Sequence, residues 1–267
     1  MGLIRIRRED LPRYQARLQA LEQLADYPIG DDRFKIDHGP DYFRFFERLG
    51  EVFYFAQEDG DRLVAVACSM LRRVPYREGE APKKCWYGAD VKVHPDYRGR
   101  RIPLSIAYKV FIPLAMRCVR GYVVSMNPGD GSPNPIVKLA KAFEWTPVDV
   151  SGTLRLYSLD ADQMTELTPL VEAHRGPISY LSLADIKDIV LQSTGAPMPL
   201  IHVQWGHCAE AGVPDPIPGS VHMFSALEDD PLALAMAERG VAPSATATVI
   251  SSGMRRSDFR FILTSDI

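Results

Sequence analysis

A short basic segment between a strand-like run and an apolar run carries the clearest chemistry in this sequence. Residues 86–93 alternate in the manner of a strand, and residues 104–119 are apolar almost all round, which predicts a buried helix. A strand, a tight turn with exposed backbone N–H groups and a helix N-terminus can together hold a phosphate. Arg98, Arg100 and Arg101 would add positive charge to such a site.

The segment resembles motif A of the GNAT superfamily of acyl-CoA N-acyltransferases. That motif is a valine-rich strand followed by Pro, an acidic residue, Tyr and then Arg-Gly-x-Gly-x-Gly or Ala. The sequence departs from it at Arg101 and Pro103, which stand where the family usually has small residues. The residues that keep the pattern are Val91, Val93, Pro95, Tyr97, Arg98, Gly99 and Ile102.

The resemblance implies how an acyl carrier would be bound. The pantetheine amides would pair with the strand at Val91 and Val93, which is strand addition by a ligand, and the backbone N–H groups of residues 98–102 would meet the phosphates. The family's second half contains a helix that begins at Asn, and residues 134–143 match it. The predicted carrier-binding residues are Val91, Val93, Arg98, Gly99, Arg100, Arg101, Ile102, Pro103 and Asn134.

Acyl transfer to an amine also needs a base that removes a proton from the acceptor. Asp90 lies three residues before Val93, where many family members carry an acidic residue, and strand alternation puts it on the opposite face from Val91 and Val93. Asp90 is predicted as this catalytic base if burial raises its pKa. A structural carboxylate that pairs with Lys92 or an arginine fits the same residues equally well.

The proton donor for the leaving thiolate is less clear in the sequence. The family often uses a tyrosine on the helix that begins at Asn, and residues 139–143 contain no tyrosine. A coenzyme A thiol is acidic enough to leave without strong acid help, so this does not exclude catalysis. Candidates to replace the tyrosine are Tyr87, Tyr122, Ser125 and His94.

The order of predicted elements favours an α/β (α+β) fold of the GNAT type, with a mixed, mostly antiparallel sheet flanked by helices. Residues 1–159 are predicted as the acyltransferase domain, 160–176 as a linker and 177–267 as a smaller C-terminal α/β domain. The last part repeats the strand, helix, strand, strand order of residues 121–157 and resembles a shortened GNAT half.

Several single segments are predicted from local patterns, and Pro113 should kink the 104–119 helix or end it early. The remaining predictions are a hairpin turn at residues 58–61, a loop at 26–39, a short helix at 183–192, and closing strand pairs 145–148 with 153–157 and 245–251 with 259–264.

The composition is that of an ordinary globular protein, with 46% hydrophobic and 24% charged residues. A net charge of -3 gives no bulk basicity of the kind that binds nucleic acid. No run reaches ~18 apolar residues and the N-terminus lacks an apolar signal core, so we expect a cytoplasmic protein that does not bind membranes. The four cysteines lack C-x-x-C spacing. No metal is expected, since no zinc pattern fits His202, His207, Cys208 and His222.

The sequence therefore predicts an N-acyltransferase that moves an acyl group, acetyl by default, from acyl-CoA to a primary amine of a small molecule or peptide. A homodimer is kept open. Pro103 removes one N–H from the helix N-terminus, and the Cβ of Arg101 disfavours glycine-only conformations. Both changes fit a donor without the pyrophosphate of coenzyme A. An alternative donor is therefore acyl carrier protein, as in N-acyl amino acid synthases. The missing tyrosine suits a third reading, a catalytically silent acyl-CoA-binding domain.

Overall fold

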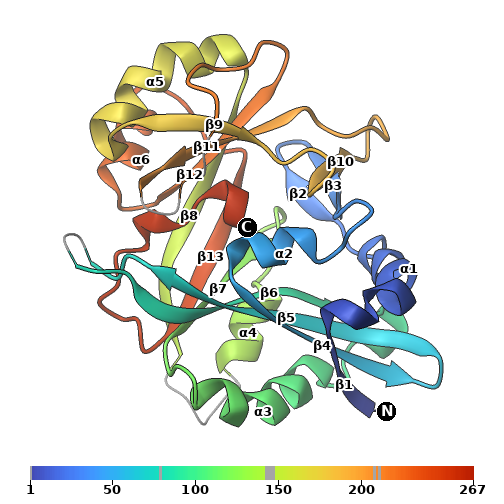
Figure 1. The fold of residues 1–267 in the computed structure, drawn as a ribbon. Coiled ribbons are helices and arrows are strands. Elements are labelled where there is room, and N and C mark those ends of the chain that lie inside the picture. Colours follow the sequence, from blue (N-terminus) through green and yellow to red (C-terminus); the bar gives the residue numbers. More distant parts are fainter. Residues whose placement is uncertain (1, 78–79, 142–147, 207–208, 210–211) are drawn as a thin grey trace.

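The computed structural model describes residues 2–77, 80–141, 148–206, 209 and 212–267. Its main layer is a twisted ten-stranded sheet with the order β1-β4-β5-β6-β7-β13-β8-β12-β11-β9, and helices pack on its faces (Figure 1). The first part of the chain forms β1 (Gly2–Ile6), α1 (Leu11–Glu22), β2 (Tyr27–Ile29), β3 (Asp32–Asp37), α2 (Arg44–Leu49), β4 (Glu51–Asp59), β5 (Arg62–Val74), β6 (Lys83–Val93), α3 (Ile102–Ala115), β7 (Gly121–Met126) and α4 (Pro135–Lys141).

The first part ends with β8 (Asp149–Leu159), and the second part runs from there to the C-terminus. It forms α5 (Ala161–Arg175), β9 (Ile178–Ser182), β10 (Asp188–Leu191), β11 (Leu200–Trp205), β12 (Val221–Leu227), α6 (Pro231–Glu238) and β13 (Ala245–Ser252). Neighbouring strands of the large sheet are antiparallel except for β6 with β7 and β11 with β12. The predicted mixed, mostly antiparallel sheet with flanking helices is therefore confirmed.

The two parts exchange equivalent strands. In the first, β5, β6 and β7 are followed across the sheet by β13, which comes from the far end of the chain. In the second, β9, β11 and β12 are followed by β8, which comes from the middle of the chain. This exchange ties each part to the other through main-chain hydrogen bonds. The predicted domain boundary at residue 159 stays a prediction. The segment predicted as a linker contains α5, which packs Met164, Leu167 and Val171 into the core.

A second, three-stranded sheet also joins the two parts. It has the order β10-β3-β2, and β10 pairs with β3 from Asp188 opposite Asp37 to Leu191 opposite Phe34. Two sequence predictions are wrong here: residues 26–39 form the β2–β3 hairpin, and residues 183–192 contain a turn and β10 in place of a helix. Both strands depend on a partner far away in the chain, which local propensity does not contain.

Of the remaining local predictions, some are confirmed and others are wrong. The hairpin turn is confirmed, since β4 and β5 meet there with Gly60 at φ +58°. The helix with Pro113 ends early, at Ala115. The pairing of residues 245–251 with 259–264 is wrong, because both edges of β13 are occupied by β7 and β8, and residues 259–261 form a 3-10 helix. Residues 145–147 of the other predicted pair lie outside the described residues, and β8 pairs with β12 and β13.

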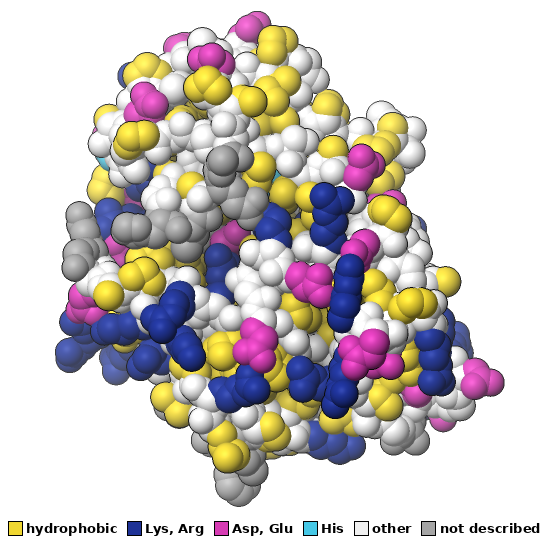
Figure 2. Space-filling view, viewed as in Figure 1, with side chains coloured by type: hydrophobic (Ala, Val, Ile, Leu, Met, Phe, Trp, Pro, Cys, Tyr) yellow, Lys and Arg dark blue, Asp and Glu magenta, His cyan; other side chains and the backbone are white. Residues whose placement is uncertain are grey.

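The surface carries charges of both signs. The face seen in Figure 2 mixes acidic and basic side chains and has a gathering of Lys and Arg near the hairpin end of β5 and β6. Within the described part of the chain, no helix combines the length and the apolar character needed to cross a membrane.

Gly39 sits where the two parts of the chain touch, and its replacement tests that junction. A Cβ at this position would lie 2.5 Å from the carbonyl oxygen of Asp185, and φ is +62°. Gly39→Ala should lower the free energy of unfolding by about 2–5 kcal/mol, from backbone strain plus overpacking. Gly60→Ala is the control, because φ is +58° there but nothing lies within 4 Å, and it should cost about 1–2 kcal/mol. Equal losses in urea unfolding would show that the close contact is absent.

Candidate active site

The site begins where two neighbouring parallel strands separate. β6 and β7 pair only at Trp86 with Gly121, Tyr87 with Tyr122 and Gly88 with Val123. Beyond Gly88, β6 runs on to Val93 while β7 runs on to Met126 without pairing between them. The facing edges of both strands therefore present backbone N–H and C=O groups to a slot in the middle of the sheet, where a ligand could pair with them.

A β-bulge lies at the mouth of this slot. Ala89 pairs with Cys68 and Lys92 with Val66, so Asp90 and Val91 both oppose Ala67, and Asp90 has φ +55°. The extra residue reverses the side-chain alternation of β6. Before the bulge Tyr87 packs on the face covered by α1 and α2, whereas after it Val93 packs toward α3.

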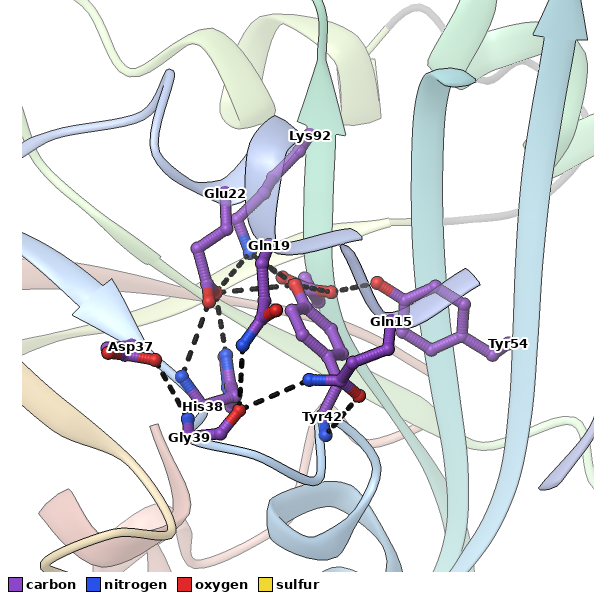
Figure 3. Close-up of polar contacts among 10 residues, drawn as sticks. Gln15, Gln19, Glu22, Asp37, His38, Gly39, Tyr42, Tyr54 and Lys92 are labelled. Carbon is purple, nitrogen blue, oxygen red and sulfur yellow. Dashed lines mark hydrogen bonds and ion pairs between the residues drawn. The ribbon is translucent and has the colours of Figure 1, made fainter. Parts of the chain in front are cut away.

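The bulge brings Asp90 and Lys92 into a buried polar cluster. The Nζ of Lys92 forms an ion pair with Asp90 and lies 3.2 Å from Glu22 Oε1. The hydroxyls of Tyr42 and Tyr54 both donate to Asp90 Oδ2, and Tyr42 OH also lies 3.3 Å from Glu22 Oε1. The labelled side chains of Glu22, Tyr42, Tyr54 and Lys92 come from α1, the segment before α2, β4 and β6 and point toward one another (Figure 3).

The cluster contains more negative than positive charges. Two carboxylates, those of Glu22 and Asp90, share the single ammonium of Lys92, and all three side chains are at most 4% exposed. Burial lowers the pKa of Lys92, and the charge of Glu22 opposes that shift. Burial would raise the pKa of Glu22, but its contacts with His38 and Lys92 outweigh burial and lower the pKa. The cluster thus leaves an excess of negative charge beside the slot, which favours a cationic ligand nearby.

His38 extends the cluster toward an adjoining cavity. Its Nδ1 lies 2.6 Å from Glu22 Oε1, and its ring packs among Tyr42, Phe45 and Phe46. Burial lowers the pKa of His38 to about 4, so the ring is neutral at pH 7 and its Nδ1 carries the proton donated to Glu22. Within the described residues Nε2 has no hydrogen-bond partner, and it is not one of the polar atoms that are completely buried without a partner. Because His38 lines the adjoining cavity, its Nε2 is an unpaired acceptor at the wall of that cavity.

That cavity of about 230 Å³ lies between the two parts of the chain. His38, Asp90 and Lys92 line it on one side, and Lys187 and His202 line it from the second part. A second cavity of about 310 Å³ lies on the α3 and α4 side of the sheet. The apolar walls of the first cavity include Tyr27, Ile29, Phe34, Ile36, Ile189 and Met223, and the residues common to both cavities are Val91, Val123 and Ile136.

The basic segment follows β6 and leads into α3, as predicted. Gly99 and Arg101 both have positive φ, +79° and +54°, so Arg101 adopts a left-handed conformation despite its Cβ. An arginine tolerates it at the cost of modest strain. Positive φ values at Gly99 and Arg101, on either side of Arg100, turn successive backbone N–H groups to one side, as in anion-binding nests. Pro103 is the second residue of α3, and within the described residues no carboxylate pairs with Arg98 or Arg101. Arg100 lies over the ring of Tyr97.

Asn134 caps α4. Its Oδ1 accepts from the backbone N–H of Ile136 at 2.9 Å, and its Nδ2 donates to the carbonyls of Ser125 and Met126. The side chain thereby fixes the start of α4 against the end of β7. Its predicted contact with a carrier stays a prediction.

The four candidate proton donors occupy different places. Tyr87 and Ser125 line the first cavity. The hydroxyl of Tyr122 accepts from Arg72, and His94 is bonded to Arg62 and to the backbone of Asp96 on the outer loop.

The histidines of the second part have other partners. His202 Nδ1 lies 3.1 Å from Thr264 Oγ1, and His222 Nε2 accepts from the backbone N–H of Ile217. His207 and Cys208 lie outside the described residues. Among the residues that the structure describes, no cluster of three His, Cys, Asp or Glu side chains is arranged to hold a metal ion.

Sequence reasoning missed Glu22, His38 and Lys187. Glu22 is one residue of an amphipathic helix, His38 lies in a segment read as a loop, and Lys187 in one read as a helix. The local signal that could have drawn attention to Glu22 is its position on the buried stripe of α1 beside Leu18 and Leu21, since a carboxylate there needs a partner.

Comparison with known proteins identifies the fold. No protein-family model matches the chain. An uncharacterized protein of Acanthamoeba polyphaga mimivirus is 21% identical over 235 residues, which cover 85% of this chain and 68% of that protein. A tandem GNAT protein from the clavulanic acid biosynthesis pathway, solved without acetyl-CoA, superposes with a TM-score of 0.50 at 13% identity, covering 96% of this chain and 99% of its own.

A conserved protein of unknown function from Enterococcus faecalis is more distant, with a TM-score of 0.46 at 8% identity, over 94% of this chain and 72% of its own. The chain has the GNAT fold, built from two GNAT-like halves. The predicted resemblance, including that of the C-terminal part, is therefore confirmed at the level of the fold.

The charge balance of the polar cluster can be tested by removing its cation. Lys92→Met should lower the free energy of unfolding at pH 7 by about 3–5 kcal/mol, because it leaves Glu22 and Asp90 buried without an ammonium. Urea unfolding measures the loss. Arg117→Met is the control, since its ion pair with Glu51 is about half exposed and should contribute less than about 1 kcal/mol.

The same variant has a distinctive pH dependence. In Lys92→Met the folded-state pKa of a buried carboxylate should lie above its unfolded value, so acid stabilises the variant. In the native protein the lowered pKa of Glu22 stabilises the fold above the unfolded pKa, and this is lost as the pH falls through the folded pKa. The difference in the free energy of unfolding between the native protein and Lys92→Met should therefore become smaller from pH 7 to pH 4. A constant difference would contradict the assigned charges.

Proposed function

We propose that the protein is a GNAT-type N-acyltransferase that moves an acyl group from acyl-CoA to a primary amine. The observation that carries the proposal is the slot between β6 and β7 at the Asp90–Val91 bulge. The cavities on the two sides of the sheet share Val91, Val123 and Ile136, which border this slot. A pantetheine arm that paired with the open strand edges would carry its thioester from the α3 side to the cavity that contains His38.

The donor's phosphates would bind at residues 98–103. The nest-like backbone, the N-terminus of α3 and the guanidinium groups of Arg98 and Arg101 offer N–H donors and charge. A pyrophosphate makes better use of these groups than the single phosphodiester of acyl carrier protein. This supports acyl-CoA over the carrier protein as donor, with acetyl-CoA as the simplest member of the class.

The acid–base chemistry would run through His38. The ammonium form of the acceptor must lose a proton before its nitrogen attacks the thioester carbonyl carbon, and the free Nε2 of His38 would accept that proton and later release it to solvent. Glu22 holds the opposite nitrogen and would stabilise the imidazolium. When the carbon–sulfur bond breaks and the amide forms, the second nitrogen proton passes to the thiolate of coenzyme A.

Asp90 would then act as a positioning residue. The sequence favours it as the base, but its carboxylate already accepts from Tyr42 and Tyr54 and pairs with Lys92. Its Oδ1 is taken by Lys92 and its Oδ2 by the two hydroxyls, so neither oxygen is free to accept the acceptor's proton. Its role would be to hold the bulge that opens the slot.

The phosphate assignment predicts a loss of donor affinity. The double variant Arg98→Ala with Arg101→Ala should bind acetyl-CoA about 10- to 100-fold more weakly in calorimetry, since charge-assisted hydrogen bonds contribute about 1.5–3 kcal/mol. Arg255→Ala with Arg256→Ala removes the same charge from exposed positions and should leave affinity unchanged. Pantetheine, which lacks the pyrophosphate, should bind both variants equally. An unaltered affinity for acetyl-CoA, or turnover only with acyl carrier protein, would refute this assignment.

The base assignment predicts a loss of turnover without a loss of binding. His38→Asn keeps a donor for Glu22 and removes the free nitrogen, so kcat should fall by about 10²- to 10⁴-fold while acetyl-CoA affinity is retained. Thiol release with a panel of primary amines measures kcat. His202→Asn makes the same change in the other cavity histidine and should retain most of the turnover. Binding of acetyl-CoA without thiol release by the native protein would instead identify a silent acyl-CoA-binding domain.

A further inference from the structure

We infer that the acceptor carries a carboxylate in addition to its amine, and that Lys187 binds this carboxylate inside the cavity between the two halves. The inference rests on the proposed N-acyltransferase function and names the acceptor class as an amino acid or similar compound with an apolar body. It gives the second half a direct part in the reaction.

Lys187 is held at the cavity by a tight junction. It ends the turn at residues 183–187, where its N–H donates to the carbonyl of Leu183 at 2.9 Å. The same turn packs on Gly39 through the carbonyl of Asp185, directly beside His38. The ammonium from the second half and the free imidazole nitrogen from the first half therefore face one cavity.

The ammonium of Lys187 lacks a counter-ion. Its Nζ lies 4.4 Å from the centre of the Phe45 ring, and among the described residues no carboxylate is within ion-pairing distance of it. Lys92, by contrast, has both Glu22 and Asp90. A buried cation without an anion is costly, and a ligand carboxylate would remove that cost.

The surroundings of Lys187 agree with an anion site. The charged and titratable groups that act on it are Glu22 of α1, Arg48 of α2, Lys92 of β6 and Asp266 near the C-terminus, and it acts in turn on His38 and His202. Burial, with further effects from Lys92 and Arg48, lowers the pKa of Lys187 to about 7. A bound carboxylate would raise that pKa again and draw a proton from solvent near pH 8.

The walls of the cavity define the rest of the acceptor. They are mostly aromatic and aliphatic side chains from β2, β3 and β10, such as Tyr27, Phe34 and Ile189. Such walls suit an apolar side chain and disfavour sugars and polyamines. The excess negative charge of Glu22 and Asp90 suits the ammonium end of the acceptor, and Lys187 suits its carboxylate end.

Matched acceptor pairs test the inference. L-leucine and L-phenylalanine are compared with their amides in the thiol-release assay, using acetyl-CoA and the native protein. The acids should have kcat/KM values about 10- to 100-fold above those of the amides, from the charge-assisted contact. Lys187→Met should raise KM for the acids with little change in kcat, remove the preference and leave KM of the amides unchanged.

A binding measurement gives a readout that does not depend on turnover. N-acetyl-L-leucine and its amide are titrated at pH 8 in two buffers that differ in ionisation enthalpy. The acid should bind with uptake of up to about one proton by the native protein, and the proton uptake should vanish in Lys187→Met.

The outcomes separate this inference from the function on which it depends. Absence of acetyl-CoA binding and of thiol release with any amine overturns the proposed function itself. Turnover with equal preference for acids and amides overturns only the role of Lys187. An equal fall in kcat for both in Lys187→Met also overturns it, because Lys187 would then act in proton transfer.

Discussion

The buried ammonium of Lys92 is the interaction on which the rest of the site depends. Two carboxylates on different elements, Glu22 of α1 and Asp90 of the bulge, converge on it. Ionised carboxylates at such depth are tolerable because that cation, two tyrosine hydroxyls and the ring N–H of His38 surround them. The cluster therefore fixes α1 against β6, keeps Asp90 in its left-handed conformation and holds open the slot between β6 and β7. It also holds His38 through Glu22 with one nitrogen free.

The second half completes what the first half leaves open. By exchanging β8 and β13, the halves share one continuous sheet, and β10 extends the small hairpin of β2 and β3 into a wall over the slot. A single GNAT-like half would expose the apolar side chains of that hairpin. The exchange thus turns an open edge into an enclosed cavity, and it brings Lys187 to within reach of a ligand held by the first half. The cavity proposed to hold the acceptor is therefore formed by the whole chain.

The sequence predicted the parts of this architecture that depend on local pattern. The run through Val91 and Val93, the turn at Gly99 and the start of α3 were recognisable because each has a strict local requirement. The bulge was not, because alternation along β6 assigns one face to each residue and an extra residue reverses that assignment. Glu22, His38 and Lys187 meet only through tertiary packing, from segments far apart in the chain. The strands β3 and β10 were missed for the same reason, since each is stabilised by the other.

The central claim is that an acyl-pantetheine arm passes between β6 and β7 at the bulge. A crystal structure of the protein with acetyl-CoA tests it most directly. We predict pantetheine paired with the open edges of β6 and β7, the pyrophosphate at residues 98–102 and the thioester in the cavity beside His38. Acetyl-CoA bound elsewhere, or a slot closed by pairing of β6 with β7 as far as Val93, would contradict it.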